Sequence, residues 1–306
     1  MEFRKLPTVL TAEELIDKIF RRASKVTGRS SKERALNKLA TISNVTKDYF
    51  KKISQTHPSY EELPEFYKEM VDIVVGIPEI KKSLGALKWA ESMVQRVISK
   101  GVREIRSGKD EQAVLKSVYG RVASIIEQID KDLRFLNEAK QKLQEIPSLG
   151  DYPTVVVAGY PNVGKSSFVA AVSTAKPDIA SYPFTTKKLS VGFLEMDGRR
   201  VQIIDTPGLL DRPISKRNEI EKRAIVALKY LADVVIFIID PTEEAYSIEK
   251  QLSLLDEIKK SFEKPVIDVY SKADLHNFRD RPAFSALTGE GIEDILKEIK
   301  KHLKIE

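Results

Sequence analysis

The sequence predicts a chain in two parts, an all-α helical bundle followed by an α/β domain whose mostly parallel sheet has one antiparallel edge strand. In the first part, apolar residues recur three and four positions apart over long stretches. In the second part, short β-branched runs alternate with helical patterns, as in parallel sheets joined by crossover helices. A glycine-rich segment follows the first of those runs directly. We therefore expect a helical domain over residues 1–148 and a phosphate-binding α/β domain over residues 149–306.

Capping residues define the helices that we expect in the first part. Thr11-Ala12-Glu13-Glu14 fits a capping box, so that one helix begins there and ends before Gly28. Pro78 suits the first turn of another helix, and Asp110 suits the cap of the last one. Long amphipathic helices with short connections pack as antiparallel, up-and-down bundles. The expected helices cover approximately residues 11–26, 31–55, 65–74, 78–105 and 110–146.

Six apolar runs in the second part predict the strands of the sheet. Asp197-Gly198, between the second and third runs, is a two-residue hairpin turn, so these two strands are expected to be antiparallel. Helical patterns separate the other runs, which implies parallel pairing. Ligands of such sheets bind at the carboxyl ends of the strands. The runs are residues 154–158, 189–196, 200–204, 234–239, 266–270 and 282–285.

The segment from Gly159 to Ser166 fits the pattern G-x-x-x-x-G-K-[ST] of a phosphate-binding loop. Its two glycines let the backbone curl around phosphate oxygens, and the N-terminus of the following helix directs N–H groups at the anion. Lys165 is expected to reach the β- and γ-phosphates. A glycine turn before a helix is the alternative, but the predicted strand before the loop and the helix after it favour phosphate binding. The expected phosphate contacts are Asn162, Val163, Gly164, Lys165, Ser166 and Ser167.

Two further segments are expected to complete a magnesium nucleotide site. Asp205-Thr206-Pro207-Gly208 follows a strand, so Asp205 can hold Mg²⁺ through a water, together with the Ser166 hydroxyl. The Gly208 N–H is expected to meet the γ-phosphate. Thr186, or its neighbour Thr185, can add a hydroxyl to the Mg²⁺ shell. The candidate catalytic residues are Lys165, Thr186 and Gly208, and the candidate metal ligands are Ser166, Thr186 and Asp205.

The segment Lys272-Ala273-Asp274, after the fifth run, indicates a guanine nucleotide. A carboxylate accepts from both N1–H and N2–H₂ of guanine, whereas adenine has no matching pair of donors. Asp274 therefore favours GTP over ATP, with Lys272 beside it in the base site. Ser285, Ala286 and Leu287 follow the last run and can place backbone N–H groups at the guanine O6. Together these segments, each after a predicted strand, indicate a P-loop GTPase domain that binds GTP and GDP.

These motifs resemble the Obg-related branch of the translation-factor class of GTPases. Tyr182-Pro183-Phe184-Thr185-Thr186-Lys187 is close to that branch's switch I signature, and the phosphate loop matches as well. Beyond the GTPase half, four features resemble the nucleolar GTP-binding protein (Nog) family. They are the opening Phe3-Arg4-Lys5-Leu6, His57-Pro58 followed by Tyr60, the helical half that ends in residues 143–149, and residues 240–252 with Tyr246-Ser247.

The resemblance implies a helix bundle joined to a G domain and a role in assembling the large ribosomal subunit. We therefore expect a GTP-hydrolysing switch that acts on pre-ribosomal particles. A GTP-loaded scaffold that binds RNA or the ribosome, and whose hydrolysis is incidental, is the alternative. A membrane- or tRNA-associated GTPase is a third interpretation, against which the Nog-like helical half argues. Because eukaryotic members continue in a long tail, this chain is expected to be the short, archaeal form.

Two departures from the family pattern affect the expected chemistry. The guanine motif usually begins with asparagine, and Ser271 is shorter, so nucleotide affinity should be lower. Leu209 stands where many small GTPases carry a glutamine that orients water, and leucine cannot hydrogen-bond water. Intrinsic hydrolysis should therefore be slow and wait on another group. In some related GTPases the asparagine at the position of Asn162 helps to bind K⁺, which makes K⁺ a candidate cofactor beside Mg²⁺.

Charge and composition bear on the partner and the location. Residues 1–60 carry 13 Lys and Arg against 6 Asp and Glu, in a chain whose net charge is +6. Ribosomal RNA or a ribosomal protein is the expected partner of this basic region, and a solvated helix face is the other interpretation. The lack of cysteines and of a long apolar run predicts a cytoplasmic protein without membrane association.

Overall fold

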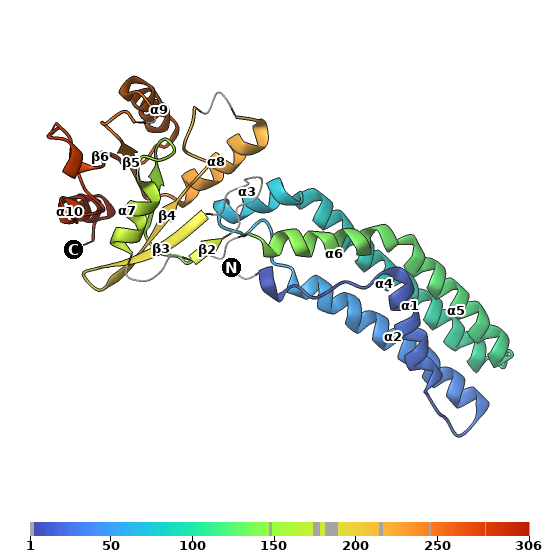
Figure 1. Cartoon of the computed structure of the whole chain (residues 1–306). Helices are drawn as coiled ribbons and strands as arrows, with labels where there is room; N and C mark the ends of the chain where they lie inside the picture. The colour runs from blue at the N-terminus through green and yellow to red at the C-terminus, as the bar shows by residue number, and fades with distance from the viewer. Residues whose placement is uncertain are drawn as a thin grey trace. The chain divides into compact units, whose positions relative to one another are not determined.

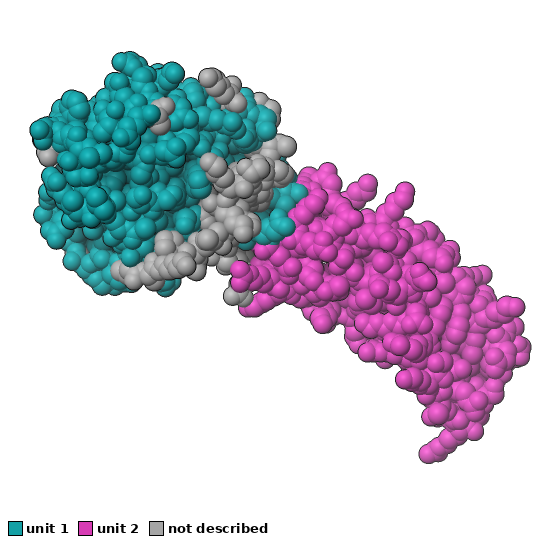
Figure 2. Space-filling model, viewed as in Figure 1, with its two compact units in different colours: residues 1, 63–74, 145–306 teal, residues 2–62, 75–144 magenta. Residues whose placement is uncertain are grey.

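The structure is a computed structural model that divides the chain into two compact units, shown in two colours in Figure 2. One unit holds residues 2–62 and 75–144, and the other holds residues 1, 63–74 and 145–306. Residues 63–74, which lie within the helical half of the sequence, thus group with the α/β part. The predicted boundary between residues 148 and 149 stays a prediction. The structure describes residues 3–146, 149–173, 178–180, 189–213, 217–244, 246–278 and 280–305.

The helical unit is a bundle in which neighbouring helices run antiparallel (Figure 1). The Nζ of Lys32, at the start of α2, lies 3.5 Å from the carbonyl of Arg106, at the end of α4. The Ser83 hydroxyl of α4 donates to Asp132 of α6, 2.9 Å away. Gly101, near the other end of α4, faces Val118 of α5. The elements are η1 (Phe3–Lys5), α1 (Ala12–Ser24), α2 (Ser31–Thr56), α4 (Ile77–Arg106), α5 (Glu111–Gln128) and α6 (Asp130–Gln144).

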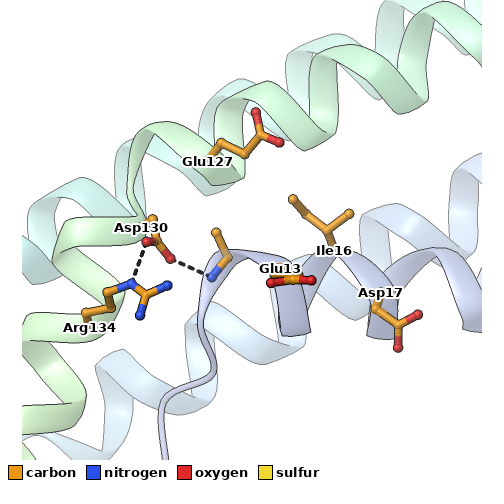
Figure 3. A pocket seen from close by; sticks show the side chains of 7 residues that line it. Glu13, Ile16, Asp17, Glu127, Asp130 and Arg134 are labelled. Carbon is orange, nitrogen blue, oxygen red and sulfur yellow. Dashed lines mark hydrogen bonds and ion pairs between the residues drawn. The ribbon is translucent and has the colours of Figure 1, made fainter.

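The last predicted helix is two helices, because the chain breaks at Ile129. The carboxylate of Asp130, at the start of α6, accepts a 2.8 Å hydrogen bond from the Ala12 N–H at the start of α1. Its other oxygen accepts a 2.6 Å bond from Nε of Arg134 (Figure 3). The Arg134 bond and the backbone bond hold the pKa of Asp130 below its usual range. The break therefore gives α1 a capping carboxylate from a distant part of the chain, beside its own Thr11 capping box.

The α/β unit is built on a six-stranded sheet in the order β2-β3-β4-β1-β5-β6. The strands β4, β1, β5 and β6 are parallel, and β3 is antiparallel to both of its neighbours. All residues of β1 and β5 are buried, as expected for parallel strands covered on both faces. The strands are β1 (Thr154–Ala158), β2 (Asp178–Ala180), β3 (Leu189–Met196), β4 (Arg199–Asp205), β5 (Val234–Ile239) and β6 (Val266–Tyr270).

Five α-helices accompany this sheet among the described residues: α3 (Glu65–Val74), α7 (Lys165–Val172), α8 (Glu219–Leu231), α9 (Ile248–Ser261) and α10 (Ile292–Leu303). The helices α7, α9 and α10 pack on the sheet, and α3 packs against α8. A helical bundle followed by an α/β domain with a mostly parallel sheet and one antiparallel strand, β3, is therefore confirmed.

Two details of the predicted sheet differ from the structure. The antiparallel strand β3, predicted at the edge, lies inside the sheet, because the short β2 pairs with its outer side. β2 was not predicted, because three residues carry too little pattern. The run at 282–285 forms only a single bridge between Ala283 and Tyr270. The backbone hydrogen bonds of this run to Tyr270 end at Phe284, whose N–H donates to the Tyr270 carbonyl. The chain then turns away from the sheet as a loop.

Candidate nucleotide-binding site

The phosphate loop joins the central strand β1 to α7, at the carboxyl end of the sheet. Gly159 has a φ of 138°, and a Cβ on it would lie 2.5 Å from the carbonyl oxygen of Ile238, so only glycine fits. Gly164, the residue before α7, also has a positive φ of 96°. The loop lines a cavity of about 400 Å³. The lining residues include the predicted contacts Asn162, Gly164, Lys165, Ser166 and Ser167.

The side chain of Lys165 reaches back over the loop. Its Nζ donates to the carbonyl oxygens of Gly159 and Tyr160, at 2.9 and 2.7 Å. Lys165 is buried, so its charge is held close to the loop and away from bulk water. A phosphate in the cavity would offer this ammonium group a full negative charge in addition to these carbonyl dipoles.

Two oxygen groups meet beside the loop, as the predicted metal site requires. The Ser166 hydroxyl donates to the carboxylate of Asp205, which is buried at the end of β4. Hydroxyl and carboxylate oxygens are the ligands that Mg²⁺ prefers, so this pair fits the ion that the motif implies. Thr185 and Thr186 lie outside the described residues. Within the ranges that the structure describes, no group of three or more His, Cys, Asp and Glu side chains could hold a metal ion.

The turn after β4 lies against the phosphate loop. The Gly159 N–H donates to the carbonyl of Leu210 at 3.0 Å. Gly208, with a φ of 80°, donates its N–H to the carboxylate of Asp211 at 2.9 Å. Leu209 is fully buried. The N–H expected to meet a γ-phosphate is therefore occupied by a carboxylate of the same turn.

The guanine motif is held by ion pairs at the ends of β5 and β6. Lys272 has a φ of 58°, and its Nζ lies 2.8 Å from Asp240 and 2.5 Å from Glu244. Burial raises the pKa of Asp240, but the bonds from Lys272 and Thr242 outweigh it and leave this pKa below its ordinary value. Ser271 is buried, and its hydroxyl donates to the carbonyl of Ile239 at 3.3 Å.

The two loops expected to recognise the base lie side by side. The Ala273 N–H donates to the carbonyl of Phe284 at 3.0 Å. The side chain of Asp274 is hydrogen-bonded to Ser285, which lowers the pKa of the Asp274 carboxyl. The Leu287 N–H points back to the Ser285 hydroxyl at 3.3 Å. The structure thus brings Asp274 and residues 285–287 together, although the Leu287 N–H is engaged within the loop.

Several supporting contacts were not predicted from the sequence. Gln251 of α9 is buried, and its amide bonds to the backbone of Asp240 and Tyr246, which fixes the loop after β5. The rings of Tyr246 and Tyr160 lie 4.5 Å apart, so this loop also touches the phosphate loop. The available sequence signal was the helical spacing of Gln251 with Leu254, Leu255 and Ile258, which places the glutamine on the apolar face of this helix.

Fold and site together define a P-loop GTPase, with the phosphate loop after the central strand and an aspartate at the end of the neighbouring strand. Residues 154–272 match the family described as 50S ribosome-binding GTPase, and residues 3–150 match the NOG1 N-terminal helical domain. The chain belongs to the NOG1 family of nucleolar GTP-binding proteins.

Three relatives show how similar the chain is to archaeal and eukaryotic proteins. An uncharacterized protein of Methanocaldococcus jannaschii is 42% identical over 287 residues, which are 89% of this chain and 81% of that protein. Nucleolar GTP-binding protein 1 of Drosophila melanogaster is 34% identical over 241 residues, 77% of this chain and 37% of that protein. Its Saccharomyces cerevisiae counterpart is 29% identical over 310 residues, 96% and 48% respectively. The chain spans less than half the length of these two eukaryotic relatives.

The predicted cytoplasmic location is wrong, because the eukaryotic relatives are named for the nucleolus. The lack of cysteines could not distinguish the two locations, since neither compartment favours disulfides. Among the helices that the structure describes, none combines the length and apolar character needed to cross a bilayer.

Proposed function

We propose that this protein is a GTP-hydrolysing switch that acts in the assembly of the large ribosomal subunit and hydrolyses GTP slowly on its own. The observation that carries the proposal is the arrangement of Lys165 and Ser166 at one cavity at the carboxyl end of the sheet, with the Asp205 carboxylate bonded to Ser166. A loop lysine, the hydroxyl of the next residue and an aspartate at the end of a neighbouring strand bind and activate a nucleoside triphosphate with its Mg²⁺ ion.

In this function each part of the site has a role. Residues 162–167 hold the phosphates, and Lys165 moves part of its bonding from the loop carbonyls to the β- and γ-phosphates. Ser166, Asp205 and Thr186 hold Mg²⁺, which neutralises phosphate charge when bound. Asp274 accepts from guanine, with Lys272 beside it and the 285–287 backbone at O6. Asn162, whose φ of 65° turns its side chain at the loop surface, is the candidate K⁺ ligand.

Two observations support slow intrinsic hydrolysis. Leu209 is fully buried, so its side chain neither reaches a water nor could bond to one. The Gly208 N–H is held by Asp211. Ribosomal particles are the proposed trigger, because the family is described by ribosome binding and its eukaryotic members by the nucleolus. The basic region of residues 1–60 is the proposed docking region for ribosomal RNA or protein.

The second candidate is a GTP-loaded scaffold whose hydrolysis is incidental. Buried Leu209 and the short Ser271 favour it, because one cannot activate water and the other weakens nucleotide binding. A variant that binds GTP without hydrolysing it, and still supports a full assembly cycle, would identify the scaffold.

The deciding experiment is GTP turnover by the pure protein, in KCl and in NaCl, with and without large ribosomal subunits. We expect slow turnover that the subunits accelerate, and acceleration by K⁺ alone would point to Asn162. Lys165→Ala, which removes the phosphate ligand, is the matched control. Tight GTP binding with no turnover under any condition would contradict the switch.

A further inference from the structure

The turn over residues 208–211 brings Asp211 to the phosphate cavity. The N–H groups of Leu209 and Leu210 turn back to the Thr206 carbonyl, at 3.1 and 3.5 Å, and the Leu210 carbonyl accepts from Gly159. The backbone of this turn is thus fixed to the phosphate loop. Asp211, the next residue, lines the same cavity as Lys165 and Ser166.

The Asp211 carboxylate connects a backbone N–H with an arginine. Its Oδ2 accepts from the Gly208 N–H at 2.9 Å, and its Oδ1 accepts from Nη2 of Arg217 at 3.2 Å. Arg217 also donates from Nη1 to the Gly208 carbonyl, at 3.0 Å. The Asp211 carboxylate therefore accepts from the Gly208 N–H and from the Arg217 guanidinium at the same time.

Arg217 is an unusual arginine, because its side chain is 0% exposed. Burial lowers the pKa of its guanidinium group, and Asp211 opposes that change. Its Nε is buried and has no hydrogen-bond partner within the part of the chain that the structure describes. A buried cation is costly without a counter-charge. If Asp211 left, Arg217 would require another anion at the same place.

We propose that the Asp211 carboxylate stands in for the terminal phosphate when GTP is absent, and that the γ-phosphate replaces it on Gly208 and Arg217. Arg217 then becomes an arginine supplied in cis for hydrolysis. Carboxylate and phosphate oxygens accept from the same donors, and both are recognised by the guanidinium fork. The inference rests on the proposed binding and hydrolysis of GTP.

The replacement of the Asp211 carboxylate by the γ-phosphate distinguishes GTP from GDP. GDP ends at the β-phosphate, which the loop and Lys165 hold, so Asp211 stays on Gly208. GTP brings a second anion to that N–H, and like charges cannot share it, so Asp211 leaves and Arg217 bonds to the γ-phosphate. Water then forms the new bond to the γ-phosphorus. The bond to the bridging oxygen breaks with its electrons on GDP, and the proton of the water passes to the phosphate.

The Asp211 part is tested by nucleotide affinity in the full chain. Asp211→Asn keeps the shape and removes the charge that opposes the γ-phosphate. We expect the ratio of GTP affinity to GDP affinity to rise by at least about tenfold. Asp256→Asn, an exposed site on α9, is the matched control and should leave the ratio unchanged. An unchanged ratio in Asp211→Asn would overturn the stand-in role.

The Arg217 part is tested by single-turnover hydrolysis and by binding of aluminium fluoride to the GDP complex, which imitates the transferring phosphate. Arg217→Gln should slow hydrolysis by at least about a hundredfold and abolish aluminium fluoride binding, with GDP affinity within about twofold. Arg217→Lys, which keeps the charge but not the fork, provides a second variant if the glutamine form does not fold. It should still be at least about tenfold slower. Arg199→Gln, exposed at the start of β4, is the control.

The outcomes separate this inference from the proposed function. If the unchanged protein neither binds nor hydrolyses GTP, the proposed function fails. If it does both and the Arg217 variants hydrolyse GTP and bind aluminium fluoride normally, only the arginine role fails. If GDP and GTP affinity fall equally while aluminium fluoride still binds, Arg217 is a structural brace and the proposal is overturned.

Discussion

Arg223 on α8 donates a 2.7 Å hydrogen bond to Asp72 on α3 and lies 3.4 Å from Glu69 on the same helix. The hydrogen bond to Asp72 raises the pKa of the Arg223 guanidinium, against the opposite effect of its partial burial. Tyr67 of α3 adds a second attachment, because its hydroxyl lies 2.9 Å from the Leu149 carbonyl and 2.8 Å from its N–H. The helix α8 follows the turn that carries Asp211 and Arg217. A helix from the first half of the sequence is therefore attached next to the segment expected to respond to nucleotide.

Reversing the charge of Arg223 should loosen this attachment. Arg223→Glu replaces two favourable pairs with repulsion from Asp72 and Glu69. Exposed pairs contribute only about 0.2–1 kcal/mol, so we expect a loss of about 1–2 kcal/mol and a fall in Tm of a few degrees. Arg199→Glu is the control for added negative charge. Asp72→Lys in the Arg223→Glu background should restore part of the stability, and no restoration would contradict direct pairing.

Replacing Ser271 with asparagine should strengthen nucleotide binding. Ser271 is buried, and a Cβ placed on Gly164 would lie 3.7 Å from the Ser271 Cβ. The Ser271 side chain therefore faces the phosphate loop at Gly164. An asparagine there can reach the loop backbone and add one or two hydrogen bonds, each contributing about 1 kcal/mol. We expect GDP affinity, measured with a fluorescent nucleotide, to rise by about tenfold. Ser173→Asn, at the residue after α7, should not raise it; an unchanged or lower affinity in Ser271→Asn would contradict the prediction.

Acid should destabilise the helical unit through His57. Burial lowers the pKa of His57 to about 4, and its Nδ1 lies 2.6 Å from the Tyr60 hydroxyl. The unfolded chain takes up this proton near pH 6.5 while the folded chain does not, so stability falls as pH drops from about 6.5 to about 4. Between pH 7 and pH 4.5 this residue should account for about 2 kcal/mol of lost stability.

Urea unfolding at the two pH values measures this loss. His57→Asn should remove that share of the pH dependence, because asparagine does not titrate. His302→Asn, at an exposed position of α10, is the control and should leave the dependence unchanged. An equal pH dependence in the His57 variant and the unchanged protein would contradict a half-buried, neutral imidazole.

Charge reversal on α1 should weaken binding to large ribosomal subunits. Arg21, Arg22 and Lys25 are exposed, whereas the Nζ of Lys18 lies 5.0 Å from the ring centre of Tyr49. The triple change to glutamate therefore reverses the exposed positive charge at the C-terminal end of α1 and leaves the Lys18 contact intact. We expect affinity to fall at least about tenfold and the salt dependence to become shallower by about two to three charges. The control reverses exposed lysines of the other unit, 297, 301 and 304; an effect of equal size there would indicate non-specific attraction.

Local pattern sufficed for the parts of the site that depend on neighbouring residues. The phosphate loop, the capping box at Thr11 and the aspartate after β4 each follow from a few adjacent positions. The meeting of Ser166 with Asp205 also followed, because parallel strands end at one edge.

What could not be predicted depends on contacts between distant residues. The helix break at Ile129 serves the N-terminus of α1, which lies 118 residues away from Asp130. Nothing in the sequence around residues 65–74 indicates that α3 attaches to α8 rather than to its neighbours in the chain. The Asp211–Arg217 pair was missed because the partners lie six positions apart in the sequence, outside any regular element.

The placement of α3 makes the nucleotide-binding unit discontinuous in sequence. Between residues 3 and 305 the backbone passes from one unit to the other after residues 62, 74 and 144, so three covalent connections join the units over this range. A fragment cut at the apparent boundary, residues 149–306, would lose residues 63–74 and bare the surface of α8 that α3 covers. A truncated form of the nucleotide-binding unit should therefore retain α3, either by circular permutation or by supplying residues 63–74 as a separate peptide.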